Sequence, residues 1–424
     1  MNKVMVFLVL VLSVNFFCAD KAAEKPGFYS LYAWYSEVPA FADEVAKVGF
    51  KWMRLGGPVF DPGEEKGFIE AVKKGINVVP VMGGDKDSDI TKMPAYRESI
   101  KKYLARYGEN GTLWKENPSV KQIPINYVEI WNEPNIEYLT PTGGKKRDEC
   151  YAEFLKVSYE EIKRFDPGIK VIGMNTAGGT MKPDGALTAE LDFNGLIGWY
   201  KFIKGVHKAG GGKYYDILGI HPYTGGKAPE KAGYIKAIEN VHADCIANGG
   251  GDKPVWVTEC GFSLPVTKKD GKGVPAEGVI KNEELQANYL IRQMAISAAC
   301  GVEQFQIMYI SDIGDFYAGL FLRGTKKWRK QTYALKNMME LLPDPVILKK
   351  LSEGTEGIYA YVFKGAGDKE TIMAWNTGKE DIEKEYEVKG TDFTLSTRDG
   401  EKKAIKAAGG KVKVTLSQSP VYIY

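Results

Sequence analysis

Histidine is scarce in this sequence of 424 residues, and cysteine is almost as rare. The three histidines are His207, His221 and His242, and no two of them form a His-x-His pair. The five cysteines are widely spaced and match no zinc-binding pattern. The sequence therefore predicts neither a metal centre nor a bound cofactor.

An excess of charge of either sign is also missing. The 57 basic and 54 acidic residues leave a formal net charge of +3. A chain with such balanced charge has no long-range electrostatic field to hold a polyanion. We therefore expect a neutral ligand and not nucleic acid. Aromatic residues make up 12% of the chain, and their flat faces suit a large core or the faces of sugar rings.

Long apolar runs are absent beyond the start of the chain. There, Lys3 precedes an apolar run over residues 4–12, after which polar residues appear. The run is too short to span a bilayer and is typical of a signal peptide, which we expect over residues 1–20. Phe16 and Phe17 make a poor cleavage site. Cys18 leaves lipid modification open, although the residues before it make a poor lipobox. The sequence thus predicts a secreted or periplasmic protein with no integral membrane span.

Four cysteines remain after such a leader is removed: Cys150, Cys245, Cys260 and Cys300. An exported protein can form disulfides, but a chain of this size does not need them. Unpaired cysteine is commonly a small core residue, so buried free thiols are the favoured interpretation.

Short apolar runs alternate with amphipathic segments between residues 27 and 343. The apolar runs cover residues 27–32, 52–55, 77–82, 126–131, 170–174, 215–220, 254–258 and 302–310. Helical patterns between them cover residues 39–48, 66–74, 94–107, 148–165, 195–209, 228–247 and 282–300. Eight buried strands, each followed by a helix, are typical of a closed parallel barrel. We therefore predict an α/β fold, a (β/α)8 TIM barrel.

The helix pattern over 282–300 has clear ends. Asn282 is a good N-cap, Glu283 and Glu284 place negative charge in the first turn, and Gly301 follows the last apolar position. Residues 263–281 before it are rich in Lys, Gly and Pro, which predicts a mobile loop over the active face.

Residues 346–424 have a different pattern, with period two and turn residues between the runs. Residues 358–363 and 371–375 flank a Gly-Ala-Gly-Asp turn, which predicts a hairpin, and residues 412–416 and 421–424 predict further strands. We expect a small antiparallel, β-sandwich-like accessory domain. A packing buttress for the barrel is favoured over a separate sugar-binding module.

Two of the barrel runs end in a carboxylate. The fourth ends in Asn132-Glu133-Pro134, and the seventh ends in Glu259. Catalytic groups of this fold lie at the carboxyl ends of strands, where both side chains can face one cleft. Glycoside cleavage needs such a pair, an acid for the leaving oxygen and a carboxylate at the anomeric carbon. The alternative for each glutamate is a solvated charge at a strand end.

At these residues the chain resembles clan A of the glycoside hydrolases, which carries an Asn-Glu-Pro acid/base motif on the fourth strand and a nucleophilic glutamate on the seventh. It is most similar to family 39, with families 5 and 51 as near alternatives. The resemblance implies a retaining hydrolase of β-glycosidic bonds in a neutral carbohydrate, such as a β-xylosidase or β-glucosidase. Glu133 would be the acid/base and Glu259 the nucleophile. A catalytically silent carbohydrate-binding protein on the same barrel is the alternative.

The resemblance also implies roles for supporting residues. Asn132 would hydrogen-bond a sugar 2-hydroxyl, and the hydroxyl of Tyr223 would orient the nucleophile. Tyr223 belongs to a His-x-Tyr motif that begins at His221, and Arg54 on the second strand would keep the nucleophile ionised. His221 could instead be a satisfied core histidine.

Glu129 precedes Glu133 on the same strand, and period two places it one layer deeper in the barrel, so we interpret it as structural. Arg54 could pair with Glu129 rather than with the nucleophile. Asn132 and Glu133 are neighbours, yet both are assigned to the cleft. This demands a bulge or an end of regular pairing at that point.

One departure from the clan concerns the eighth strand, where many members carry a tryptophan beneath the first sugar. This chain has Tyr309 in that region, which predicts a smaller platform. Further aromatic residues follow strand ends and are candidates to line the cleft: Trp34, Tyr35, Tyr138, Phe262, Phe316 and Tyr317.

Overall fold

The computed structural model describes residues 25–56, 62–83, 90–136, 139, 141–178, 199–265, 280–313 and 316–424, without the side chains of residues 62–64. The expected signal peptide with Cys18, the candidate Tyr138, and residues 266–279 of the expected loop lie outside these ranges. None of the described helices combines the length and the apolar character that a membrane span requires.

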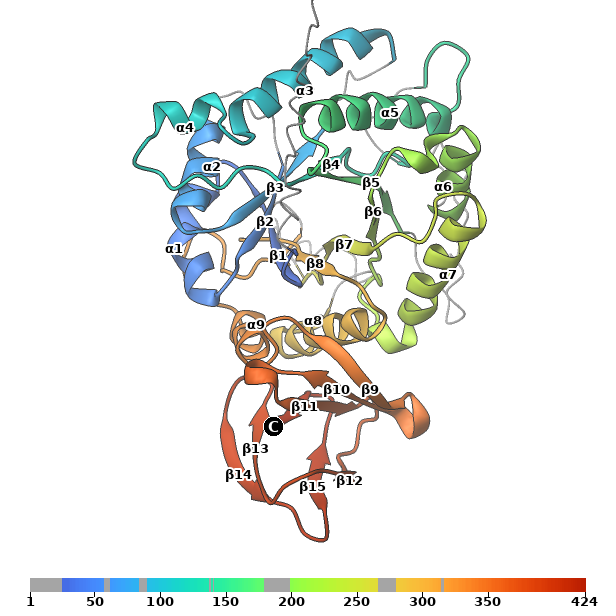
Figure 1. Cartoon of the computed structure of the whole chain (residues 1–424). Helices are drawn as coiled ribbons and strands as arrows, with labels where there is room; N and C mark the ends of the chain where they lie inside the picture. The colour runs from blue at the N-terminus through green and yellow to red at the C-terminus, as the bar shows by residue number, and fades with distance from the viewer. Residues whose placement is uncertain are drawn as a thin grey trace, which may run out of the picture.

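The eight predicted strands form a closed parallel barrel in the order β1 to β8 (Figure 1). They are β1 (Tyr29–Trp34), β2 (Trp52–Gly56), β3 (Asn77–Met82), β4 (Tyr127–Ile130), β5 (Lys170–Ala177), β6 (Ile217–His221), β7 (Val255–Cys260) and β8 (Gln304–Ile307). β1 closes the barrel because it pairs with both β2 and β8. The predicted fold class is confirmed.

Helices surround the barrel, as Figure 1 shows. They are α1 (Val38–Val48), α2 (Pro62–Lys73), α3 (Met93–Tyr107), α4 (Thr112–Glu116), α5 (Arg147–Phe165), α6 (Trp199–Lys208), α7 (Tyr234–Ala247), α8 (Glu283–Ala299) and α9 (Lys330–Leu341). Short 3₁₀ turns are η1 (Ile90–Lys92), η2 (Gly211–Lys213), η3 (Pro229–Lys231), η4 (Thr355–Gly357) and η5 (Ala366–Asp368).

The local signals explain where several helices begin and end. Asn282 caps α8, because its side chain accepts a hydrogen bond of 2.9 Å from the amide of Leu285, as the sequence predicted. Gly49 ends α1 in a left-handed conformation with φ of 117°. The single helix predicted over 228–247 is wrong, since Gly233, also left-handed, separates η3 from α7.

The lower interior of the barrel is closed by large apolar side chains from alternate positions of its strands. This interior layer consists of Trp52, Val79, Tyr127, Ile172, Ile217 and Trp256. A core packed in this way leaves no room for a ligand below the carboxyl ends of the strands. The open end above the layer is therefore where a site can form.

The C-terminal residues form two antiparallel sheets that pack face to face. The larger sheet has the order β14-β13-β16-β11-β10-β9, and the smaller consists of β12 and β15. The strands are β9 (Val346–Glu353), β10 (Ile358–Lys364), β11 (Glu370–Asn376), β12 (Ile382–Glu387), β13 (Asp392–Thr397), β14 (Lys402–Lys406), β15 (Lys411–Leu416) and β16 (Val421–Ile423). The predicted hairpin is β10 and β11, paired from Ile358 to Asn376.

This β domain packs directly on the barrel helices and lies below α8 and α9 in Figure 1. Trp375 is fully buried in the same core as Leu290 and Met338 of those helices. Its indole nitrogen donates a hydrogen bond of 2.7 Å to Glu230, which Arg292 of α8 holds in a bidentate pair at 2.6 Å. These contacts support the interpretation of the domain as a buttress.

The buttress can be tested by removing one ring. Trp375→Ala deletes a fully buried aromatic side chain at this interface, so the free energy of unfolding should fall by about 3–5 kcal/mol in denaturant titrations. Tyr333→Ala on α9, whose ring is 52% exposed, is the matched control and should change it by less than about 1 kcal/mol. Equal effects of the two variants would contradict a shared core.

Candidate active site at the carboxyl ends of the strands

The chain leaves regular strand geometry where the fourth strand delivers its polar residues. β4 ends at Ile130, and Trp131 and Glu133 have positive φ angles of 71° and 43°. The sequence analysis predicted that regular strand pairing ends at Asn132 and Glu133, and this prediction is confirmed. Two neighbouring side chains can therefore serve the same site.

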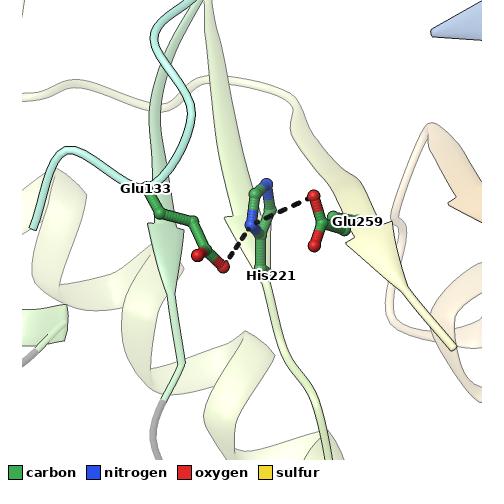
Figure 2. A group of neighbouring side chains, drawn as sticks. All are labelled: Glu133, His221 and Glu259. Atoms are coloured by element: carbon green, nitrogen blue, oxygen red, sulfur yellow. Dashed lines mark hydrogen bonds and ion pairs between the residues drawn. The ribbon is translucent and has the colours of Figure 1, made fainter. Parts of the chain in front are cut away.

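Glu133 and Glu259 lie on either side of His221, as Figure 2 shows. The Nδ1 atom of His221 is 2.9 Å from a carboxylate oxygen of Glu133 and 3.9 Å from one of Glu259. One oxygen of each glutamate and this ring nitrogen all lie within 4.8 Å of one another. Both glutamate side chains keep slight exposure, 14% and 11%, so the pair is reachable from solvent.

Arg54 holds the base of this site. Its Nε and Nη2 atoms donate to the two oxygens of Glu129 at 2.8 and 2.5 Å, and its Nη1 donates to Glu259 at 3.0 Å. The two alternatives that the sequence left open for Arg54 are therefore both true. Burial raises the pKa of Glu129, and the Arg54 guanidinium beside it opposes that rise.

The guanidinium of Arg54 and the hydroxyl of Tyr223 orient the side chains of Asn132 and Glu259. Asn132 accepts a hydrogen bond of 2.9 Å from Arg54 through Oδ1, which leaves its amide nitrogen as the donor for a ligand. Tyr223 donates from its hydroxyl to Glu259 at 2.7 Å. Because Arg54 binds the other oxygen, both oxygens of Glu259 are held in place.

His221 is fully buried, as a core histidine would be, yet it contacts the site through Nδ1. Burial lowers its pKa to about 4; among its neighbours, Glu259 and Glu129 act against this and Arg54 adds to it. His221 is therefore neutral near pH 7, so only one of its ring nitrogens carries a proton.

Aromatic rings form one wall of the site. Tyr309, which is partly buried, lies with its ring centre 5.3 Å from that of Tyr32 and 5.8 Å from that of Phe316. Phe316 in turn meets Tyr223 edge to face at 6.1 Å. Trp34 packs edge to face on Tyr32 at 5.7 Å and is 40% exposed. This aromatic wall is thus continuous from the exposed indole of Trp34 to Tyr223, which contacts Glu259.

Tyr32 is a member of this wall that the sequence analysis missed. The guanidinium of Arg54 lies 4.6 Å from the centre of its ring. The two residues are register partners on β1 and β2. Because register partners on neighbouring strands point to the same face, the alternation of β1 was the signal that could have identified it.

Two aromatic candidates do not line the site. Tyr35 is buried in the core, where its hydroxyl meets that of Tyr103 at 3.4 Å. Phe262 is also buried, and its ring packs edge to face on Tyr289 at 5.7 Å. Both residues follow strand ends, but their side chains pack against the helices α3 and α8. Tyr317 is partly exposed and is tied to Leu264 through its backbone.

The cysteines have the state that the sequence favoured. Cys150, Cys245 and Cys260 are buried free thiols, and Cys300 is a partly buried free thiol. Cys260, directly after Glu259, donates to Gln293 of α8 at 3.3 Å, so this thiol packs between β7 and its helix.

Glu133, His221 and Glu259 are close enough to act as ligands of one metal ion. A divalent cation there would lie close to Arg54, whose guanidinium already contacts Glu259 at 3.0 Å. The repulsion between the two cations opposes metal binding at this cluster.

Solved structures of glycoside hydrolases share this fold. A family 39 glycoside hydrolase from the gut symbiont Bacteroides cellulosilyticus has a TM-score of 0.67 at 19% identity, covering 94% of this chain and 81% of that one. A monomeric β-xylosidase from Caulobacter crescentus has a TM-score of 0.58 at 15% identity, covering 94% and 97%. A glucosidase from Croceicoccus marinus has a TM-score of 0.63 at 13% identity, covering 94% and 95%. No protein-family model and no curated protein matches the sequence.

The buried ion pair makes a prediction about stability. Arg54→Met leaves Glu129, which is 0% exposed, without its cation, so the free energy of unfolding should fall by about 3–5 kcal/mol. Adding Glu129→Leu should recover most of that loss in the same denaturant titration. Arg97→Met is the matched control, because Arg97 is 38% exposed and Arg164 still pairs with its partner Glu161. A double variant as unstable as the single one would contradict this account.

The buried histidines predict a pH dependence of stability. Burial lowers the pKa of His221 and of His207 to about 4, with Lys253 adding to the effect at His207. An unfolded histidine titrates near 6.5, so the unfolded chain binds more protons below that pH. The contribution of the neutral histidines to the free energy of unfolding should therefore be fully present above pH 6.5 and fall towards pH 4. For His221 the fall between pH 7 and 5 should be about 2 kcal/mol. His207→Gln should reduce the dependence of the free energy of unfolding on pH. An unchanged dependence would show that His207 does not contribute to it. His242→Gln is the control.

Proposed function

We propose that the protein is a retaining glycoside hydrolase that cleaves β-glycosidic bonds through Glu133 and Glu259. One observation carries the proposal: a carboxylate oxygen of Glu133 and one of Glu259 lie within 4.8 Å of each other. Retaining enzymes hold their two carboxyl groups about 5–5.5 Å apart, whereas inverting enzymes leave about 6.5–9.5 Å for a water molecule. The short separation favours direct attack by one glutamate.

The two glutamates then take different parts in two steps. Glu259 attacks the anomeric carbon and forms a glycosyl ester while Glu133 gives its proton to the leaving oxygen. In the second step Glu133 takes a proton from water, and the water oxygen displaces Glu259 from the anomeric carbon. Net retention follows, because each displacement inverts the configuration once.

The surrounding groups suit these roles. Arg54 and Tyr223 donate to the two oxygens of Glu259, which aims the nucleophile and stabilises its charge between the steps. A neutral His221 beside Glu133 adds no positive charge that would oppose protonation of that carboxyl. Asn132 has a free amide donor for a sugar hydroxyl, and the aromatic wall offers apolar faces to a sugar ring.

We propose a neutral sugar as substrate, a β-xyloside or a β-glucoside. With Glu133 protonated, the carboxylates of Glu129 and Glu259 still outnumber the one cation, Arg54, and this net negative charge would repel an acidic sugar. A β-xylosidase and a glucosidase are among the structures that share the fold. A catalytically silent sugar-binding protein would not need both glutamates held by separate donors.

We also propose that the protein is exported by a signal peptide over residues 1–20, with Cys18 as a candidate for lipid modification. This rests on the apolar run that follows Lys3. Pulse labelling of the expressed full-length chain should show a larger precursor converted to a mature form outside the cytoplasm.

Turnover of aryl β-glycosides tests the proposed activity. A panel of 4-nitrophenyl β-xyloside, β-glucoside and related β-glycosides should include at least one substrate that releases nitrophenol, and EDTA should leave the rate unchanged. The panel should also include the α-anomers, which should not react. If the pure protein hydrolyses no β-glycoside or β-linked oligosaccharide yet binds one, the silent binding protein is favoured instead.

Variants of the two glutamates should fail in different ways. Glu133→Ala should keep appreciable turnover on a substrate whose leaving group needs no proton, and azide should accelerate it to give a β-glycosyl azide. Glu259→Ala should lose about 10⁴-fold or more in kcat on every substrate, and azide rescue should give the α-glycosyl azide. Product anomers can be read by NMR.

An exposed glutamate on α3 provides the control for these variants. Glu98 has a side chain that is 56% exposed, and Glu98→Ala should retain wild-type kcat and KM. Reversed azide anomers would exchange the two roles, and wild-type activity in both site variants would place the catalytic centre elsewhere.

A further inference from the structure

β5 loses its regular geometry beside the catalytic pair. Met174 and Asn175 have positive φ angles of 75° and 42°, and the pairing of β5 with β6 shifts between Met174 and Thr176. Residues other than glycine occupy this conformation only when their surroundings hold them there. The bulge turns the Asn175 side chain into contact with other strands of the barrel.

Asn175 contacts the chain next to both glutamates. Its Nδ2 donates to the carbonyl of Ile130, the last residue of β4, at 3.0 Å, and its own carbonyl accepts from the amide of Glu133 at 3.1 Å. Its Oδ1 accepts a hydrogen bond of 3.3 Å from the hydroxyl of Thr258, the residue directly before Glu259. One fully buried side chain therefore links the ends of β4 and β7.

Other contacts fix the same junction. Tyr151 of α5 donates to the carbonyl of Ile130 at 2.9 Å and accepts from the amide of Met174 at 3.0 Å. Asn135 and Ala177 exchange two hydrogen bonds, of 3.1 and 2.9 Å. The turn that carries Glu133 is thus tied to the bulge of β5 at several points.

The neighbouring strand leaves space for this amide. A Cβ atom placed on Gly219 of β6 would lie 1.9 Å from Oδ1 of Asn175, which is far inside contact distance. Gly219 is the register partner of Met174 at the bulge. Only a residue without a side chain at position 219 admits Asn175 in its observed place.

We propose that Asn175 is a positioning residue that sets the separation of the Glu133 and Glu259 carboxylates. The inference rests on the proposed glycoside hydrolase activity and extends it to a residue that is buried and cannot touch substrate. It acts by fixing the backbone before each glutamate, so that one can attack while the other protonates. Losing it should impair the chemical step and spare substrate binding.

Steady-state kinetics on the best β-glycoside of the panel tests this role. Asn175→Ala should lower kcat by about tenfold to 100-fold, because a misplacement of about 1 Å can cost about 100-fold, while KM should stay within about twofold. Thr258→Val removes only the hydrogen bond between Asn175 and β7 and should lower kcat less than Asn175→Ala does. Thr258→Ser keeps the hydroxyl and should have a kcat close to that of the wild type.

Asn337→Ala is the matched control. Asn337 is a buried asparagine on α9 whose amide donates to the carbonyls of Thr397 and Arg398, far from the pair along the fold. Its loss should lower stability without lowering kcat per folded molecule. If Asn175→Ala does not fold, Gly219→Ala, which displaces the same amide, takes its place in the comparison.

Crystal structures of the wild type and of Asn175→Ala separate this inference from the activity on which it rests. The separation of the closest carboxylate oxygens, which is within 4.8 Å in this structure, should be larger in the variant than in the wild type, whether or not any glycoside is cleaved. A wild type without turnover but with this movement would refute the function and keep the positioning role. An unmoved pair, an unchanged kcat, or a raised KM with unchanged kcat would each overturn the proposal.

Discussion

The buried guanidinium of Arg54 is the group on which the arrangement of the site depends. A cation taken out of water costs several kcal/mol unless charged partners surround it closely. Arg54 has two, Glu129 in a bidentate pair and Glu259 through a single bond, and Tyr32 covers one face of its plane. Because these partners come from β1, β4 and β7, the charge is compensated only when the barrel has closed in the correct register. The closed barrel is therefore required to bring all the partners of Arg54 together.

The apolar layer beneath this ion pair strengthens it. Tyr127 lies between Trp52 and Trp256, with ring centres 5.4 and 5.1 Å away, and their side chains fill the barrel axis. Water cannot approach Arg54 and Glu129 from below, so their attraction acts in a medium of low polarity. The slightly exposed oxygens of Glu133 and Glu259 above it remain open to a ligand. The barrel thus buries Arg54 and Glu129 and leaves Glu133 and Glu259 accessible.

The β domain is connected to the strand that carries Glu259 through the helix α8. α8 is buried on nearly all sides because the barrel covers one face and the β domain the other. Through Gln293 this helix contacts Cys260, the residue after Glu259, and through Arg292 it binds the carboxylate of Glu230, which Trp375 also contacts. α8 is therefore in contact both with the β domain and with the strand that carries Glu259.

The sequence by itself determined the eight strands, the helix capped by Asn282 and the two strand-end glutamates, because alternation, caps and strand-end carboxylates are local patterns. It did not show β9, β12, β13 or β14, in which most residues are not buried and the core face is therefore weakly marked. It could not choose between Glu129 and Glu259 as the partner of Arg54, could not separate Tyr35 from Tyr309, and gave Asn175 no distinguishing signal. Only the tertiary structure decided these points, because each depends on distances between strands and on positive φ angles that the closed barrel imposes on residues with no preference for them.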